Sequence, residues 1–283
     1  MRTIAHISDL HFGRVERFAD EALMLDLREM APSLIAISGD LTQRALDRQF
    51  RRARAYLARL PAPYIVVPGN HDIPLFDVTR RFLLPLHRYK FYISAHLSPL
   101  YVDNEITVLG VNTARSMVLE SGKISQKQLK NTEAVLTSMP QTTLRVIVTH
   151  HPFVRPAAVK KYRKIVGGAD EALRCFEKCD VDLILSGHFH RAHAEDLRTS
   201  HAFLTRSIVH VQAGTAISSR LRSQPNSYNL ITIDDDRIHV EVREWHGQSF
   251  VSGEKIDFRK KDGHWVRVGS VTPSVAVPDQ QIP

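Results

Sequence analysis

The feature that most constrains this chain is the alternation of short β-branched apolar runs with amphipathic stretches of helical period. Apolar runs begin at Thr3, Leu34, Tyr64, Ile106, Leu144, Val181 and Ile208. Helical periodicity between them predicts helices at about 17–30, 46–60, 126–138 and 170–178. Strands that alternate with helices are typical of an α/β fold with a mostly parallel sheet.

The pattern changes after Ile208, where strand-type runs follow one another without helices. Their alternation of apolar and polar residues predicts antiparallel strands that form or complete a second sheet. We therefore expect one domain, residues 1–265, in which two sheets pack together. The remaining residues, 266–283, contain three prolines and little charge, so we expect a loose or surface-lying tail.

Composition bounds the function only loosely. The chain has 283 residues, of which 43% are hydrophobic, so it can bury a full core. Its formal net charge of +8 agrees with a phosphate-bearing partner, but solvated lysine and arginine faces explain such a charge more often. Cys175 and Cys179 lack the second pair of ligands that a zinc site needs. With no apolar run of about 18 residues and no signal-peptide pattern, we expect a cytoplasmic protein without a membrane span.

Residues that can bind metals follow five of the predicted strands. These residues are Asp9, His11, Asp40, Asn70, His150, His188 and His190. Ligands of α/β sheets bind at the carboxyl ends of the strands, so we expect these side chains to meet at one edge. Carboxylate, amide and imidazole donors suit Mn, Fe or Zn. Seven ligands exceed one catalytic ion but suffice for two that share a carboxylate, an arrangement that catalyses displacement at phosphorus.

The motifs DLH, GD, GNHD, THHP and GHFH, between residues 9 and 190, resemble in order the signature of the calcineurin-like metallophosphoesterases. The resemblance implies the fold of that family, an α/β two-sheet β-sandwich of mixed sheets flanked by helices. It also implies two divalent metal ions. One would be held by Asp9, His11, Asp40 and His190, and the other by Asp40, Asn70, His150 and His188, with Asp40 as the bridge.

The resemblance implies further that His71 is not a ligand but faces the leaving group as an acid or as a stabiliser of the transition state. His151 would then lie beside the metals and orient or stack against the ligands. Many relatives carry an acid that orients this histidine, and here Gln43 occupies that position. Asp72 or a backbone carbonyl would then have to orient His71. Relatives also often have an aspartate where this chain has Asn112.

The function implied is a two-metal phosphodiesterase, most similar to the bacterial class III cyclic-nucleotide phosphodiesterases. A hydroxide that bridges the metals would attack small diesters such as 3',5'-cyclic nucleotides. Asp40, Asn70 and His71 are the predicted catalytic residues. Arg44, Asn70 and His71 are the predicted substrate-binding residues, although Arg44 also begins an arginine-rich stretch that fits a solvated helix face.

Three alternatives remain at this point. A hydrolase of a nucleotide-linked lipid diphosphate, of the UDP-diacylglucosamine type, would need an apolar patch near the metals, which residues 82–91 could supply. A nuclease would use the positive charge as a groove for nucleic acid, but aromatic residues interleaved with the basic ones are lacking. A scaffold without activity would be expected to lack His71 or several ligands. The segment 73–97 either walls the metal centre or packs as an amphipathic helix, and a homo-oligomer is left open.

Overall fold

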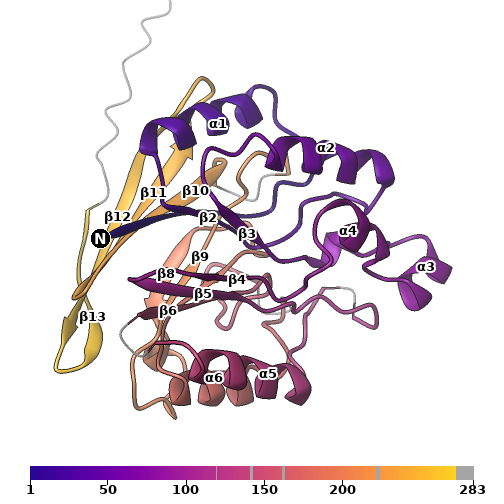
Figure 1. Ribbon diagram of the computed structural model, residues 1–283. Helices are drawn as coiled ribbons and strands as arrows, with labels where there is room; N and C mark the ends of the chain where they lie inside the picture. Colours follow the sequence, from indigo (N-terminus) through magenta and orange to yellow (C-terminus); the bar gives the residue numbers. More distant parts are fainter. Residues whose placement is uncertain (119, 141–142, 161–162, 221–223, 272–283) are drawn as a thin grey trace, which may run out of the picture.

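Two mixed β-sheets pack face to face and helices cover their outer faces in the computed structural model, which describes residues 1–118, 120–140, 143–160, 163–220 and 224–271 (Figure 1). The seven-stranded sheet has the order β13-β12-β11-β10-β1-β2-β3 and the six-stranded sheet the order β4-β5-β6-β7-β9-β8. This arrangement confirms the predicted fold class. Helices α1 and α2 lie on the first sheet, and α5 and α6 lie on the second (Figure 1).

The elements have the following bounds. The first sheet contains β1 (Arg2–Ile7), β2 (Leu34–Ile37), β3 (Tyr64–Val66), β10 (Ser227–Asp234), β11 (Arg237–Trp245), β12 (Phe250–Lys261) and β13 (His264–Val271). The second contains β4 (Leu100–Val102), β5 (Ile106–Gly110), β6 (Leu144–Val148), β7 (Val181–Ser186), β8 (His193–Asp196) and β9 (Val209–Gln212). The helices are α1 (Ala19–Met30), α2 (Asp47–Leu57), α3 (Val78–Leu83), α4 (His87–Tyr92), α5 (Gln126–Thr137) and α6 (Ala169–Lys178), with short 3₁₀ turns η1 (Asn70–Asp72) and η2 (Leu197–Thr199).

The core between the sheets is built from strand residues that alternate toward the opposite sheet. Ile4 and Ile231 of the first sheet belong to the same buried cluster as Val146 and Val211 of the second. Two further clusters lie under α1 and α2 and under α5 and α6. Strands β1, β2 and β3 are parallel, as are β5, β6, β7 and β9, so their carboxyl ends point to one edge of the sandwich.

The prediction for the strands after Ile208 was partly wrong. β9 joins the second sheet in parallel with β7, and β10 to β13 extend the first sheet by antiparallel pairing that starts on β1. Without β10, the side of β1 that faces away from β2 would be an unpaired edge of the sheet. Pairing with β10 satisfies the hydrogen-bonding groups of that edge. The predicted domain boundary at residue 265 falls inside β13, where Trp265 is buried in the core between the sheets. Residues 272–283 of the predicted tail lie outside the described residues.

The segment 73–97 contains two short helices with different roles. In α4, Tyr89 is buried and its hydroxyl donates to the Val66 carbonyl, 3.0 Å away. In and around α3, Phe76, Phe82 and Leu83 are at least half exposed. The segment therefore packs on the first sheet and also presents an apolar surface. Among the described residues, none of the helices combines the length and apolar character needed to cross a membrane.

Candidate metal centre

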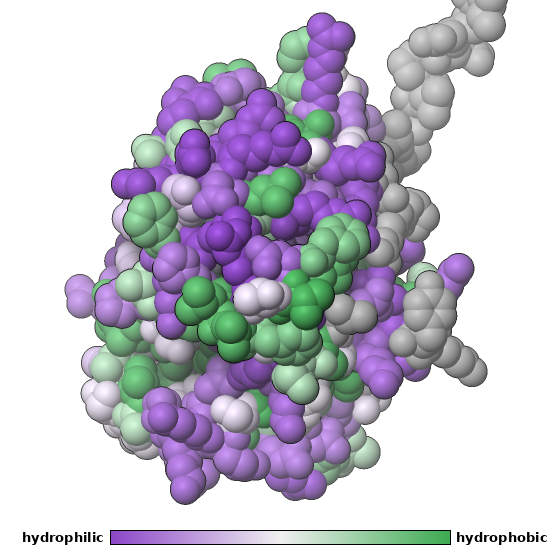
Figure 2. Space-filling view, turned by 90° about the vertical axis from the view of Figure 1, so that its right-hand side faces the viewer, coloured by the Kyte–Doolittle hydropathy of each residue, from purple (hydrophilic) through white to green (hydrophobic). Residues whose placement is uncertain are grey.

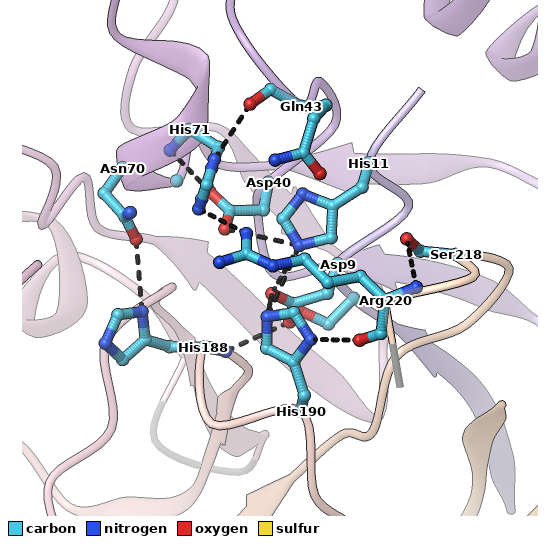
Figure 3. A network of polar contacts seen from close by, with 12 residues as sticks. Asp9, His11, Asp40, Gln43, Asn70, His71, His188, His190, Ser218 and Arg220 are labelled. Carbon is cyan, nitrogen blue, oxygen red and sulfur yellow. Dashed lines mark hydrogen bonds and ion pairs between the residues drawn. The ribbon is translucent and has the colours of Figure 1, made fainter. Parts of the chain in front are cut away.

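All seven residues predicted to bind metals come together at the carboxyl ends of the parallel strands. Asp9 and His11 follow β1, Asp40 follows β2, Asn70 begins η1 after β3, His150 follows β6, and His188 and His190 follow β7. Figure 3 shows six of them around one centre, with both sheets contributing. The chain topology thus joins residues that are up to 181 positions apart in sequence, from Asp9 to His190.

One group consists of Asp9, His11 and His190, all of them buried. Asp9 Oδ1 lies 3.3 Å from His190 Nε2 and 3.5 Å from His11 Nε2, and the two imidazole nitrogens are 3.4 Å apart. Donor atoms that surround one ion at about 2.1 Å lie about 3.0–3.4 Å from one another. The spacing of this group therefore fits a single divalent ion.

A second group lies beside the first and contains Asp40, Asn70, His150 and His188. Asn70 Oδ1 lies 3.1 Å from both His150 Nε2 and His188 Nδ1, and His150 Nε2 is 3.4 Å from Asp40 Oδ2. Asp40 Oδ2 also lies 3.8 Å from His11 Nε2 of the first group. Asp40 is therefore placed between the two groups, where a bridging carboxylate has to be.

One carboxylate oxygen of these groups lacks a hydrogen-bond partner among the described residues. Asp9 Oδ2 accepts hydrogen bonds from the Ser8 hydroxyl and the His188 amide, but Asp9 Oδ1 is buried and has no hydrogen-bond partner in the described part of the chain. A buried carboxylate oxygen without a partner is costly. His150 Nδ1 donates to the Ser38 carbonyl at 2.7 Å, which leaves Nε2 directed at the side-chain oxygens of Asn70 and Asp40. The residues present therefore fit a pair of divalent cations.

Electrostatic coupling in the centre supports the same conclusion. Burial lowers the pKa of His150, but the adjacent Asp40 carboxylate raises it further, to about 9. Burial raises the pKa of Asp40, whereas His150 and other histidines hold it well below its usual range. Without metals, a proton on His150 thus compensates the Asp40 carboxylate, and divalent cations can supply the same positive charge.

The backbone at these positions is also unusual. Five of the seven residues have a positive φ, namely Asp9 (54°), His11 (47°), Asp40 (53°), His188 (74°) and His190 (58°). This left-handed conformation costs non-glycine residues about 1 kcal/mol or more each and tends to cluster at functional sites. The sharp turns it produces at the strand ends direct the side chains toward the centre.

His71 lies at the edge of the centre and is oriented by a backbone carbonyl. Its Nδ1 donates to the carbonyl of Gln43 at 2.9 Å, so Nε2 carries the free lone pair. Arg220 Nη1 donates to that Nε2 at 2.8 Å (Figure 3). Burial lowers the pKa of His71, while Asp40 opposes this, and the imidazole is therefore neutral. Of the two orienting groups expected from the sequence, the carbonyl is the one found.

Asp72 supports the neighbouring loops and does not contact the imidazole of His71. Its carboxylate accepts hydrogen bonds from the amides of Leu41, Thr42 and Gly69 and from the Thr42 hydroxyl, at 2.9–3.2 Å. These bonds tie the loop after β2 to the loop after β3. Asp72 thereby holds Asp40 and His71 at their relative positions.

Two arginines that lie near the centre, Arg163 and Arg220, could not be assigned to it from the sequence. Arg163 is buried, and its Nη2 donates to the His188 carbonyl at 3.1 Å. Arg220 follows β9 on the same edge, where the sequence leaves open whether it contacts substrate or holds a loop. Its position after a strand was the available signal. Only the folded chain shows that it reaches His71.

The remaining predicted residues have clear surroundings. His151 is buried, its Nδ1 lies 2.7 Å from Thr113 Oγ1, and its ring meets that of His150 edge-on. Asn112 Oδ1 accepts from the Ala114 amide at 2.9 Å and so stabilises a turn. Arg44 is exposed, and its guanidinium lies 4.8 Å from the centre of the Phe76 ring.

A cavity of about 870 Å³ opens over the centre. Its lining includes Asp40, Asn70, His71, His188 and His190, and six arginines: Arg14, Arg44, Arg48, Arg81, Arg163 and Arg220. A cavity of this volume accommodates a ligand of nucleotide size. Its cationic lining favours an anionic ligand.

Comparison with known proteins agrees with this geometry. Residues 2–192 match the model of the calcineurin-like phosphoesterase family. A protein of Synechococcus sp. described as "Probable cyclic nucleotide phosphodiesterase" is 26% identical over 200 residues, which cover 67% of this chain and 74% of that protein. A protein of Arcobacter nitrofigilis described as "Probable glycerophosphodiester phosphodiesterase GpdQ" is 24% identical over 162 residues, or 56% of this chain and 57% of that protein.

The same fold occurs in a solved structure of a dimetal phosphatase from Danio rerio. The two structures superpose with a TM-score of 0.64 over 89% of this chain and 98% of the phosphatase, at 14% sequence identity. At this level of identity the superposition speaks for the architecture alone. It agrees with two mixed sheets whose strand ends meet at one edge.

Proposed function

Because the chain belongs to the calcineurin-like phosphoesterase family, we propose that it is a dinuclear metal-dependent phosphodiesterase that hydrolyses small phosphodiesters. The observation that carries the proposal is the pair of donor groups linked by Asp40, with His71 at their edge. A scaffold without activity would not need a neutral imidazole and an arginine beside such a centre. The family match and the two phosphodiesterase-type relatives support the same activity.

The metal-binding residues in this proposal are seven residues whose donor atoms converge; a donor atom of His151 also lies within 4.8 Å of those of His150 and His188. Asp9, His11, Asp40 and His190 would hold one ion, and Asp40, Asn70, His150 and His188 the other. Mn, Fe and Zn all suit this mixture of donors. Bound there, two such ions would neutralise charge on the phosphoryl oxygens and activate water for attack.

The chain's own residues would position the substrate and stabilise the charge that develops in the transition state. His71 is neutral, so its Nε2 can accept a proton and can then donate it to a leaving oxygen. Arg220 is within hydrogen-bond distance of that atom and carries two donors that match phosphate oxygens. Asn70 lines the same cavity and would contact the bound phosphate from another side, and Arg44, also in the lining, would contact another part of the substrate.

Cyclic nucleotides are the first substrates to test, because the Synechococcus relative is described as acting on them. The experiment uses metal-free protein reconstituted with Mn, Fe or Zn. Substrates are 3',5'-cyclic AMP, 2',3'-cyclic AMP, glycerophosphocholine, bis(4-nitrophenyl) phosphate and 4-nitrophenyl phosphate. We expect the diesters to be hydrolysed faster than the monoester. Absence of turnover with all three metals would refute the proposed activity.

A second candidate, hydrolysis of a nucleotide-linked lipid diphosphate, is favoured by the apolar surface at α3. Leu75 lines the cavity, and Phe76, Phe82, Leu83 and Leu84 nearby are at least half exposed. Figure 2 shows hydrophobic side chains grouped within the otherwise hydrophilic face on which α3 and α4 lie. Acyl chains could rest there while the diphosphate enters the cavity.

CDP-diacylglycerol in mixed micelles tests the second candidate. If it is the better substrate, kcat/KM for it will exceed the value for cyclic AMP. Phe82→Ser combined with Leu83→Ser will then lower that value and leave bis(4-nitrophenyl) phosphate hydrolysis unchanged. Equal effects of the double substitution on both substrates would count against a role of the patch in lipid binding.

A further inference from the structure

The cavity contains more cationic side chains than the phosphate that is hydrolysed requires. Arg220 and Arg163 are engaged with His71 and His188 at the metal centre. A phosphodiester carries one negative charge, which two divalent ions and the groups around them already compensate. Three further arginines line the cavity at α2 and the loops before it: Arg14, Arg44 and Arg48.

These three arginines come from different segments that are joined by one side chain. Gln49 accepts a hydrogen bond from the Arg44 amide through Oε1 at 2.9 Å and directly follows Arg48 in α2. The same side chain lies against Gly13, where an added Cβ atom would be 2.3 Å from Gln49 Nε2. Gly13 precedes Arg14. The backbones of the three arginines are thus brought together before any ligand binds, which lowers the entropic cost of binding.

The guanidinium groups of these three arginines are not paired with acidic side chains of the described residues. In the described part of the chain, Arg14, Arg44 and Arg48 form no ion pair, whereas nearby Arg88 lies 2.8 Å from Asp47. Glu120 also lines the cavity, without an ion pair to any of them. Clustered like charges repel one another, so an anion that neutralises them binds favourably.

The cationic lining also continues past Arg48. An adjoining hollow of about 460 Å³ shares Gly13, Arg48 and Gln49 with the main cavity and adds Arg51 and Arg52. The main cavity contains no Phe, Tyr or Trp among its described lining residues. Bases of single-stranded nucleic acid stack on such side chains, so a small phosphorylated substrate fits better than a nucleic acid strand.

We propose that Arg14, Arg44 and Arg48 form a second anion subsite, which binds a phosphate of the substrate other than the one that is hydrolysed. The preferred substrates are then small nucleotide-type molecules that carry a diphosphate or an additional phosphate. This inference rests on the proposed phosphodiesterase function and concerns the substrate class of the same cavity.

A matched pair of chromogenic substrates isolates the subsite. Thymidine 5'-(4-nitrophenyl phosphate) and its 3'-phosphorylated form undergo the same reaction, in which water attacks the 5'-phosphorus and 4-nitrophenolate leaves. We expect kcat/KM to be at least about tenfold higher for the 3'-phosphorylated form, as one charge-assisted contact can provide. Arg48→Ala is expected to remove most of that preference.

Arg54→Ala is the matched control. Arg54 lies on the same helix, is exposed and lines neither cavity, and its removal changes the net charge by the same amount. We expect it to keep the preference. Equal losses for both variants would assign the effect to overall charge, and equal kcat/KM values of the wild type for both substrates would overturn the subsite. A preference for single-stranded DNA over both chromogenic substrates would contradict the subsite and indicate a nucleic-acid groove instead.

Calorimetry separates failure of this inference from failure of the proposed function. Metal-free protein is titrated with thymidine 5'-phosphate and with thymidine 3',5'-bisphosphate. The subsite is supported if the wild type binds the bisphosphate more tightly than the monophosphate and Arg48→Ala removes this difference. This result would hold even if no diester is hydrolysed. Equal affinities, with active hydrolysis of bis(4-nitrophenyl) phosphate, refute the subsite alone.

Discussion

Arg220 Nη1 lies 2.8 Å from Nε2 of His71, although the two residues are 149 positions apart in sequence. The guanidinium can only donate, so the imidazole nitrogen accepts. The Gln43 carbonyl accepts a hydrogen bond from the other ring nitrogen, Nδ1, at 2.9 Å. One tautomer of a neutral imidazole is therefore selected from both sides. In the proposed reaction, both residues face the position that a substrate phosphate would occupy.

Replacement of His71 tests its catalytic role. His71→Ala should lower kcat on bis(4-nitrophenyl) phosphate by about 10²- to 10⁴-fold, because a positioned acid–base group typically contributes that much. Metal content measured by mass spectrometry should stay at the wild-type level, since the imidazole is not among the converging donor groups. Unchanged turnover would remove His71 from the mechanism, and loss of metal would make it a ligand.

Replacement of Arg220 tests the guanidinium beside His71. Arg220→Ala should reduce kcat/KM by about 10- to 100-fold, because charge-assisted bonds to phosphate are among the strong hydrogen bonds. Arg220→Lys should retain only part of the wild-type kcat/KM, since an ammonium lacks the planar pair of donors. Arg54→Ala, which removes an equal charge away from the cavity, is the control. An equal decrease for Arg54→Ala and Arg220→Ala would contradict a local role.

Removal of the metals should destabilise the protein as well as inactivate it. Ligands that bind only the native state stabilise it by about 2.7 kcal/mol at a hundredfold excess over Kd. Asp9→Asn should lower metal content and abolish the increase in Tm on metal addition. Asp26→Asn serves as the control, because Asp26 binds Arg243 and Tyr228 rather than the metal centre. It should lower Tm and keep the metal response.

Gly69 should not tolerate a side chain. An added Cβ atom would lie 2.1 Å from Asp40 Oδ1 and 2.4 Å from the Asp40 amide nitrogen. Gly69→Ala is therefore expected to displace Asp40, to lower the free energy of unfolding by about 1–3 kcal/mol and to reduce metal binding. At Gly269, by contrast, no atom lies within 4 Å of the added Cβ, so Gly269→Ala should be neutral in urea denaturation. Similar stabilities of the two variants would contradict this packing argument.

Stability should decrease below neutral pH in part through His210. Burial lowers the pKa of His210 from 6.5 to about 3 in the folded protein. Between these values the unfolded chain binds a proton that the folded chain does not, so the free energy of unfolding increases with pH across this window. His210→Gln removes the titration and should reduce the slope between pH 6 and pH 4 by about 1.4 kcal/mol per pH unit. An unchanged slope in urea titrations would show that His210 is already protonated in the folded state.

Much of the fold and of the grouping of the candidate metal ligands was predictable because the signals are local. Each strand is visible as an apolar run, and the polar residues shortly after its end can be read from the sequence. Asp40, three residues after the end of β2, is an example. Parallel strands place their carboxyl ends together, so convergence of the seven donors followed from topology alone. The pairing of β10 to β13 was less accessible, because an alternating strand fits the edge of either sheet. The sheet to which these strands add depends on which sheet edge the rest of the chain leaves open.

The sequence by itself determined the donor atoms of the candidate metal centre, because their chemistry lies in the side-chain types and in motifs a few residues long. Only the tertiary structure decided how His71 is oriented and that Arg163 and Arg220 join the centre. The orienting group at Gln43 is a backbone carbonyl, which every residue type has and no motif reveals. The arginines act across long sequence separations, and their side chains reach the centre only when both sheets are packed together.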